Sequence, residues 1–168
     1  MKEGQRRVVG IFYITWHADG YFTFKSPYNA DVTKILAADP KARLGALVSE
    51  AQLANVKKYV EIGEKEGARL LVGGRQPDPM PGKGYFYQPT IFDNVQPNST
   101  IAQEEIFGPV LATLQFNDAD ELVKLANGTM YGLAAAIWTK DIKKAHRLAK
   151  EIKAGTVWIN TYNNYDAA

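Results

Sequence analysis

The chain has 168 residues, of which 46% are hydrophobic and 23% charged, and its 20 basic and 18 acidic residues give a net charge of +2. These values are typical of one soluble globular domain and argue against a surface that follows nucleic-acid phosphates, so no nucleic-acid partner is expected. The complete lack of cysteine excludes disulfide bonds, a thiolate nucleophile and cysteine-ligated zinc from these residues.

The first 38 residues form a divergent segment. Residues 8–16 are apolar and follow basic residues, as in a signal peptide, but their β-branched and aromatic content and the lack of a small-residue cleavage site favour a strand. With residues 17–20 as a turn and 21–25 as a second strand, a β-hairpin is the simplest interpretation. A strand leading into a helix is the alternative, and only residues 30–38 are clearly helical. No apolar run approaches the roughly 18 residues of a membrane span, so we expect no membrane association and a cytoplasmic location.

A helix is predicted to begin after Ser49. Ser49 and Gln52 have the spacing of a capping box, in which the Ser49 hydroxyl accepts from the Gln52 amide and the Gln52 side chain reaches back. One face of this helix is apolar and is expected to be buried; it carries Leu53, Val56, Val60 and Gly63. The helix should stop at Gly67, and a short strand should follow over residues 69–72.

The next stretch, residues 75–84, is rich in proline and glycine and is predicted to be a loop. Short strands are expected at residues 85–88 and 90–95, separated by Pro89. Residues 110–116 form a third predicted strand. Asp118 and Glu121 then have the spacing of a second capping box, which opens a helix that ends at residues 127–128.

The last third of the chain repeats the alternation of strand and helix. Strands are predicted at residues 133–139 and 156–160, with a helix between Asp141 and Gly155. The buried face of this helix is expected to contain Ile142, Ala145, Leu148, Ala149 and Ile152. Such alternation, with nearly continuous apolar strands, predicts an α/β fold with an open, mostly parallel sheet and helices on both faces, to which an N-terminal hairpin or strand is appended.

The run from Glu104 to Val110 reads Glu-Glu-Ile-Phe-Gly-Pro-Val and resembles the signature of the NAD(P)-dependent aldehyde dehydrogenases. Other short motifs occur in the order of that family: residues 45–49, 67–68, 73–74, 84–86, 88–90, 131–133 and 155–160. The resemblance extends from about Asp39 to Tyr165. It implies that residues 39–168 are part of a catalytic domain, with residues 1–38 appended to a single globular domain.

In that family, the second glutamate of the signature binds the hydroxyls of the nicotinamide ribose and the phenylalanine packs against the nicotinamide ring. The resemblance assigns these roles to Glu105 and Phe107, and it places Tyr165 in the tunnel through which the aldehyde enters. A solvated loop carboxylate for Glu105, a core aromatic for Phe107 and a rim or terminal tyrosine for Tyr165 are the structural alternatives.

The family attacks its aldehyde with a cysteine thiolate in a Gly-Gln-x-Cys context. Here Gly4 and Gln5 place Arg7 at the cysteine position, and a guanidinium has no lone pair to donate. The resemblance therefore implies an interior portion of a longer family member, with the general base and the cofactor domain upstream. We expect no catalytic residue in this chain, no activity of the chain alone, and no binding of NAD or NADP by it.

Other sites are not supported by the sequence. No Gly-x-Gly-x-x-Gly or Walker-type loop is present, and His17 and His146 are isolated, so no metal site is expected. The alternative function is a non-catalytic binding or assembly module, which forms a homo-oligomer through surface exposed on the catalytic-domain scaffold.

Overall fold

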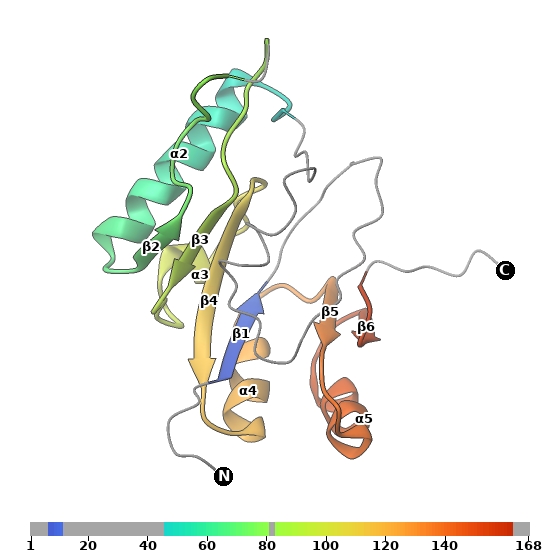
Figure 1. Cartoon of the computed structure of the whole chain (residues 1–168). Helices are drawn as coiled ribbons and strands as arrows, with labels where there is room; N and C mark the ends of the chain where they lie inside the picture. Colours follow the sequence, from blue (N-terminus) through green and yellow to red (C-terminus); the bar gives the residue numbers. More distant parts are fainter. Residues whose placement is uncertain (1–6, 12–45, 81–82, 163–168) are drawn as a thin grey trace, which may run out of the picture. The chain divides into compact units, whose positions relative to one another are not determined.

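The computed structural model describes residues 7–11, 46–80 and 83–162 of the chain (Figure 1). These residues belong to two compact units. The first unit contains described residues 8–11 and 46–115, and the second contains described residues 7 and 116–162. The predicted segments at residues 12–45, including the second hairpin strand and the helix at 30–38, lie outside the described residues and stay predictions.

The first unit is built on a four-stranded sheet with the strand order β1-β4-β3-β2. Its strands are β1 (Arg7–Ile11), β4 (Val110–Phe116), β3 (Thr90–Asp93) and β2 (Arg69–Val72). β3 and β4 are parallel, whereas β2 and β3 are antiparallel. Because β2 is the last strand in this order, it lies at one edge of the sheet. The strands predicted at 69–72 and 110–116 are confirmed at those bounds.

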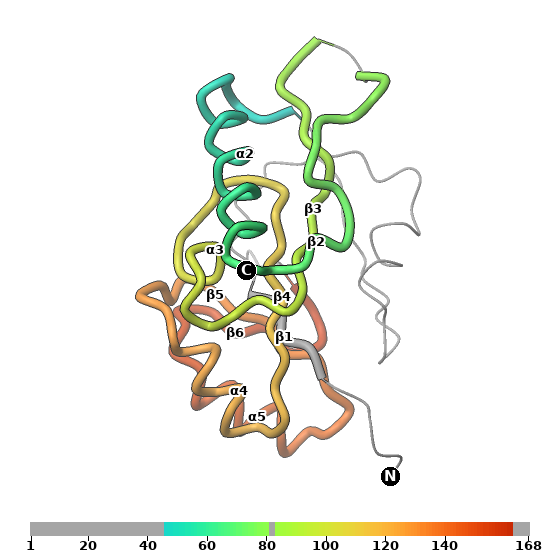
Figure 2. Tube along the Cα trace, turned by 90° about the vertical axis from the view of Figure 1, so that its left-hand side faces the viewer, coloured from blue at the N-terminus to red at the C-terminus, as the bar shows by residue number. Residues whose placement is uncertain are grey.

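The helix α2 (Glu50–Lys65) lies beside β2 and β3 in both views (Figures 1 and 2). Its apolar face is buried as predicted, at Leu53, Val56, Val60 and Gly63. Gly63 allows close packing, because a Cβ there would lie 2.9 Å from Ile101 Cδ1. Ile101 belongs to the short helix α3 (Thr100–Gln103), which has a single turn and therefore no periodicity that the sequence could reveal.

The start of α2 confirms one half of the predicted capping box and corrects the other. The Ser49 hydroxyl accepts from the Gln52 amide at 3.1 Å. The Gln52 side chain does not return to the cap; its Nε2 donates instead to the carbonyl oxygens of Ile106 and Phe107. A partner more than fifty residues away has replaced the local one.

The second unit contains α4 (Ala119–Ala126), β5 (Ala134–Ile137), α5 (Ile142–Glu151) and β6 (Thr156–Ile159). β5 and β6 are parallel, as are β3 and β4. The α/β class is therefore confirmed, with parallel pairs in both units beside the antiparallel pair of β2 and β3. The Asp118 and Asp141 carboxylates cap α4 and α5, respectively, by accepting from backbone amides of the first turn. Ala145 and Leu148 are buried as expected, but Ile142 is 64% exposed, which corrects its assignment to the buried face.

The strand predicted at residues 85–88 is also wrong. Tyr85 alone of these four residues forms a β-bridge, an isolated one to Leu47. The amide of Gln88 donates to the carbonyl of Arg75 within the loop region, so it is not available to a strand ladder. Among the helices that the structure describes, none has the length and apolar character that crossing a bilayer requires.

Candidate functional site

The signature run forms the loop between α3 and β4. Ile106 and Gly108 are buried there, Glu105 is half-buried, and the Phe107 side chain is 53% exposed. Phe107 has a φ of 53°, which costs a residue with a Cβ about 1–2 kcal/mol. An exposed aromatic side chain on a strained backbone is typical of a binding site whose surroundings impose the conformation.

Two polar side chains of α2, those of Gln52 and Asn55, hold the backbone of this loop. Gln52 Nε2 lies 2.9 Å from the Ile106 carbonyl oxygen and 2.8 Å from that of Phe107. Asn55 Nδ2 makes a longer contact of 3.4 Å with the Ile106 oxygen. Two net hydrogen bonds of about 1 kcal/mol each are enough to offset the cost of the positive φ.

The close approach of the loop to α2 requires a glycine at position 108. A Cβ at Gly108 would lie 2.3 Å from Val56 Cγ2 on α2, so only glycine permits this approach. The following residue, Pro109, accepts a hydrogen bond from the Thr90 amide at 2.7 Å, which joins the loop to the start of β3. The loop is therefore held from α2 on one side and from the sheet on the other.

The two adjacent glutamates of the signature differ in their contacts. Glu104 accepts a hydrogen bond from the Tyr59 hydroxyl at 2.7 Å. In the part of the chain that the structure describes, the Glu105 carboxylate has no hydrogen-bond or ion-pair partner. A carboxylate is acceptor-only and can receive two donors.

A sequence model described as the aldehyde dehydrogenase family matches residues 14–168. The chain belongs to the aldehyde dehydrogenase family. It is 51% identical over 124 residues to a betaine aldehyde dehydrogenase of Bacillus subtilis (strain 168), a match that covers 73% of this chain and 25% of that protein. A betaine aldehyde dehydrogenase of Brucella anthropi is 50% identical over 135 residues, covering 77% of this chain and 28% of the relative.

Solved aldehyde dehydrogenases are similar in structure as well. An NAD+ complex of an aldehyde dehydrogenase from Bacillus cereus has a TM-score of 0.73 and 42% identity, and the match covers 82% of this chain and 29% of that chain. An indole-3-acetaldehyde dehydrogenase of P. syringae in complex with NAD+ and IAA has a TM-score of 0.69 and 49% identity, over 73% and 25% of the two chains. The chain thus spans about a quarter of the length of the aldehyde dehydrogenases that it matches.

Several motifs shared with the aldehyde dehydrogenases have structural roles in this chain. A Cβ at Gly73 would lie 2.1 Å from the Pro89 carbonyl oxygen. Asn160, at a φ of 55°, accepts from the Thr139 amide at 2.9 Å and donates to the Thr139 carbonyl at 3.0 Å. The backbone at Gly73, just after β2, thus approaches Pro89, just before β3, and the Asn160 hydrogen bonds join the segments that follow β5 and β6. Both motifs have a role in the scaffold.

The other residues that the sequence analysis considered are mostly outside the described part of the chain. Tyr165 lies outside the described residues, as do His17 and the Gly4-Gln5 pair. Arg7 begins β1, but its side chain is not described. Within the described ranges, no three His, Cys, Asp or Glu side chains gather as metal ligands would.

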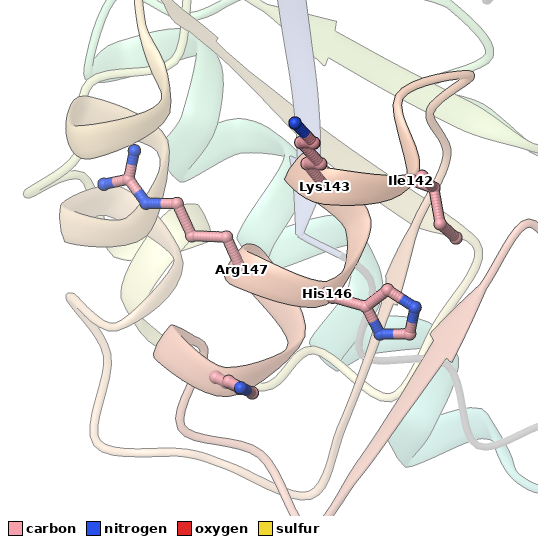
Figure 3. Close-up of a pocket in the computed structure, with 5 residues that line it drawn as sticks. Ile142, Lys143, His146 and Arg147 are labelled. Atoms are coloured by element: carbon pink, nitrogen blue, oxygen red, sulfur yellow. The ribbon is translucent and has the colours of Figure 1, made fainter.

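One shallow depression of about 460 Å³ lies along α5. It is lined by residues of that helix alone: Ile142, Lys143, His146, Arg147 and Lys150. Figure 3 shows Arg147 extending toward α4, where it pairs with Asp120, and His146 pointing away from it. Glu151 and Asp120 raise the pKa of Arg147 above its usual range, mainly through hydrogen bonds. Because all of its lining residues belong to one helix, the depression is part of a solvated helix face rather than an enclosed site.

The residues that hold the loop, Gln52, Val56 and Tyr59, were not predicted as part of the site. Their spacing on α2 places them on one face of the helix. The sequence signal was a row of polar residues, Gln52, Asn55 and Tyr59, beside the apolar face of the helix. Such a row does not show which distant segment it will contact.

Proposed function

We propose that this chain forms the nicotinamide-contacting part of an NAD(P)-dependent aldehyde dehydrogenase. The observation that supports this most directly is the half-exposed Phe107, held at positive φ by α2, beside a Glu105 carboxylate with no partner among the described residues. The Bacillus cereus relative is an NAD+ complex, which agrees with a cofactor of this class.

The chemistry of these two residues fits the ribose and ring of a nicotinamide cofactor. Glu105 offers acceptors to two hydroxyl donors, and Phe107 offers an apolar face that orients a planar ring without competing polar contacts. In the family reaction, the oxidation of an aldehyde to a carboxylic acid, the chemistry supplied by bound NAD(P) is the acceptance of a hydride. The role of this loop is to bind and orient.

A chimera can test the two residues during turnover. The matching segment of a full-length betaine aldehyde dehydrogenase would be replaced by residues 46–162 of this chain. Glu105→Gln is expected to raise KM for NAD about tenfold, because hydrogen bonds to a charged acceptor are among the stronger ones. Glu104→Gln is the matched control, since that carboxylate already accepts from Tyr59, and its KM should stay within about twofold of the parent. Equal effects of the two substitutions would refute the assignment.

We also propose that the 168-residue chain has no dehydrogenase activity of its own. The thiolate is the nucleophile that this chemistry needs, and the chain contains no cysteine. The assay follows reduced cofactor with aliphatic and aromatic aldehydes and either NAD or NADP, and an active chimera serves as the positive control. Cofactor reduction that scales with the amount of this chain would disprove the proposal.

Weak cofactor binding by the chain alone forms part of the same proposal. Glu105 and Phe107 contact one end of a dinucleotide, and no phosphate-binding loop is present in the sequence. Titration calorimetry is expected to give no measurable heat with NAD or NADP at micromolar concentrations. A micromolar dissociation constant would contradict this expectation.

The second candidate function is assembly, and it is favoured by the edge of the sheet. β2 is the edge strand, and its Leu71 and Val72 are 37% and 39% exposed. An edge strand with exposed apolar side chains favours pairing with another chain, so we propose a homo-oligomer through this surface. Light scattering should show a larger species that Leu71→Lys reduces to a monomer and that Ala54→Lys on α2 leaves intact. A monomer at all concentrations would exclude assembly.

A further inference from the structure

Gln52, a polar residue near the start of α2, has a role that goes beyond helix packing. Gln52 is the third residue of the helix, where a glutamine side chain ordinarily returns to the N-cap. Here it is directed instead at the carbonyl oxygens of Ile106 and Phe107, at 2.9 and 2.8 Å. A side chain that leaves its local partner for two carbonyls of the candidate site invites a functional explanation.

The geometry of the two carbonyls is informative. In an extended chain successive carbonyls point to opposite sides, so a single donor group cannot reach both. Here both oxygens lie within hydrogen-bond distance of the single Gln52 Nε2, so the non-extended backbone at Phe107, with its φ of 53°, presents them to the same side. One amide nitrogen has two N–H groups, which is the number that this pair of acceptors requires.

Asn55, the next polar residue on this side of α2, makes a weaker contact. Its Nδ2 lies 3.4 Å from the Ile106 oxygen, whereas Gln52 donates to the Ile106 and Phe107 oxygens at 2.9 and 2.8 Å. Of these two side chains, Gln52 therefore makes the shorter hydrogen bonds and the only one of the pair to Phe107.

We infer that Gln52 is a positioning residue that holds Phe107 in its left-handed conformation and thereby presents the ring for nicotinamide binding; the nature of the ligand rests on the proposed function. The loop is thus prepared in the free protein. Removal of the Gln52 donors should let Phe107 return to negative φ and become mobile.

Two substitutions in the 168-residue chain separate the donors from other effects. Gln52→Glu replaces the donors with acceptors that repel the carbonyls, yet a glutamate at this third position suits the helix start. Gln52→Met removes the donors without adding charge. Gln96→Glu is the matched control, because the Gln96 side chain makes a long contact of 3.4 Å, with the Asn94 carbonyl, and its shorter hydrogen bonds involve its backbone oxygen, which the substitution keeps.

The first readout is nuclear magnetic resonance of the Phe107 backbone. In wild type and Gln96→Glu, the Phe107 amide should have an order parameter of about 0.85. It should also show the strong intraresidue NOE between amide and α protons that a positive φ produces. In both Gln52 variants the order parameter should fall below about 0.6 and this NOE should weaken. The amide of the fully buried Phe92 serves as the internal control and should not change.

Three results would overturn the inference. The first is that either Gln52 variant leaves Phe107 as rigid as in wild type. The second is that Gln96→Glu makes Phe107 as mobile as the Gln52 variants do. The third is that the order parameter of the Phe92 amide changes as much as that of Phe107. This readout needs no ligand, so its outcome is independent of the proposed function.

The second readout uses nicotinamide mononucleotide as the probe. Saturation transfer from the protein to the nicotinamide protons should be reduced about threefold or more by Gln52→Glu and by Phe107→Ala, and not by Gln96→Glu. If Phe107→Ala has no effect, the proposed function fails while the positioning role is still judged by Phe107 rigidity. If Gln52→Glu alone has no effect, Gln52 does not position the ring for its ligand.

Discussion

The contact between Gly108 and Val56 gives a quantitative test of how α2 supports the signature loop. Gly108 is buried, and Val56 is completely buried. An alanine Cβ at position 108 would lie 2.3 Å from Val56 Cγ2, and 3.4 Å from both Val56 Cβ and Cγ1. The overlap with one methyl group is severe, whereas the rest of the valine lies at the limit of ordinary contact.

The magnitudes follow from this geometry. Gly108→Ala should lower the free energy of unfolding by about 1–3 kcal/mol, the usual cost of overpacking a well-filled core. Val56→Ala removes two buried methyl groups and should cost about 2 kcal/mol. In the double variant the new methyl occupies space that the valine has vacated, so the total cost should be close to that of Val56→Ala alone. The expected coupling is about 2 kcal/mol in the stabilising direction.

The assay is urea unfolding followed by far-ultraviolet circular dichroism, which reports total helix content; α2, with 16 residues, is the longest of the described helices. All four proteins must show a single transition with similar slopes for the comparison to hold. If the two costs add to within about 0.5 kcal/mol, the two residues are not in the contact described, and the account of how the loop is supported is wrong.

Three further predictions concern the scaffold. Gly73→Ala should cost at least about 2 kcal/mol more than Gly67→Ala in urea unfolding, because both residues have positive φ but only position 73 adds a clash with a backbone oxygen, at 2.1 Å; equal costs would rule out the clash. Asn160→Ala should cost about 2 kcal/mol and Asn160→Gly about 1 kcal/mol, since both lose the two Thr139 hydrogen bonds and glycine alone tolerates a φ of 55°; the reverse order of thermal stability would contradict this. Burial, followed by the charges of nearby glutamates, raises the pKa of Tyr87 to about 12. The folded state therefore favours the neutral phenol, and its contribution is present below the unfolded pKa of about 10 and lost as pH rises from about 10 to 12. Tyr87→Phe should flatten the fall in stability over that range, and an unchanged pH profile would show that Tyr87 does not cause it.

The sequence predicted those features that depend on residues close together in the chain. Ser49, Asp118 and Asp141 each accept from amides two or three residues ahead, so a short window contains both partners of each cap. The apolar face of α2 and the strand at residues 110–116 follow from periodicity and composition. Glu105 and Phe107 belong to one short signature run, so their proximity likewise follows from the order of the residues.

Tertiary structure alone decided how those two residues are presented. Gln52 is separated from the carbonyls that it holds by 54 and 55 residues, and no local pattern distinguishes such a partner from the N-cap that the side chain was expected to contact. The need for glycine at position 108 likewise arises from contact with Val56 on α2, a distant segment, and the positive φ of Phe107 is found in the loop that these segments hold. Conformations of this kind are imposed by neighbours that the chain brings together only on folding, so they cannot be read from the order of the residues.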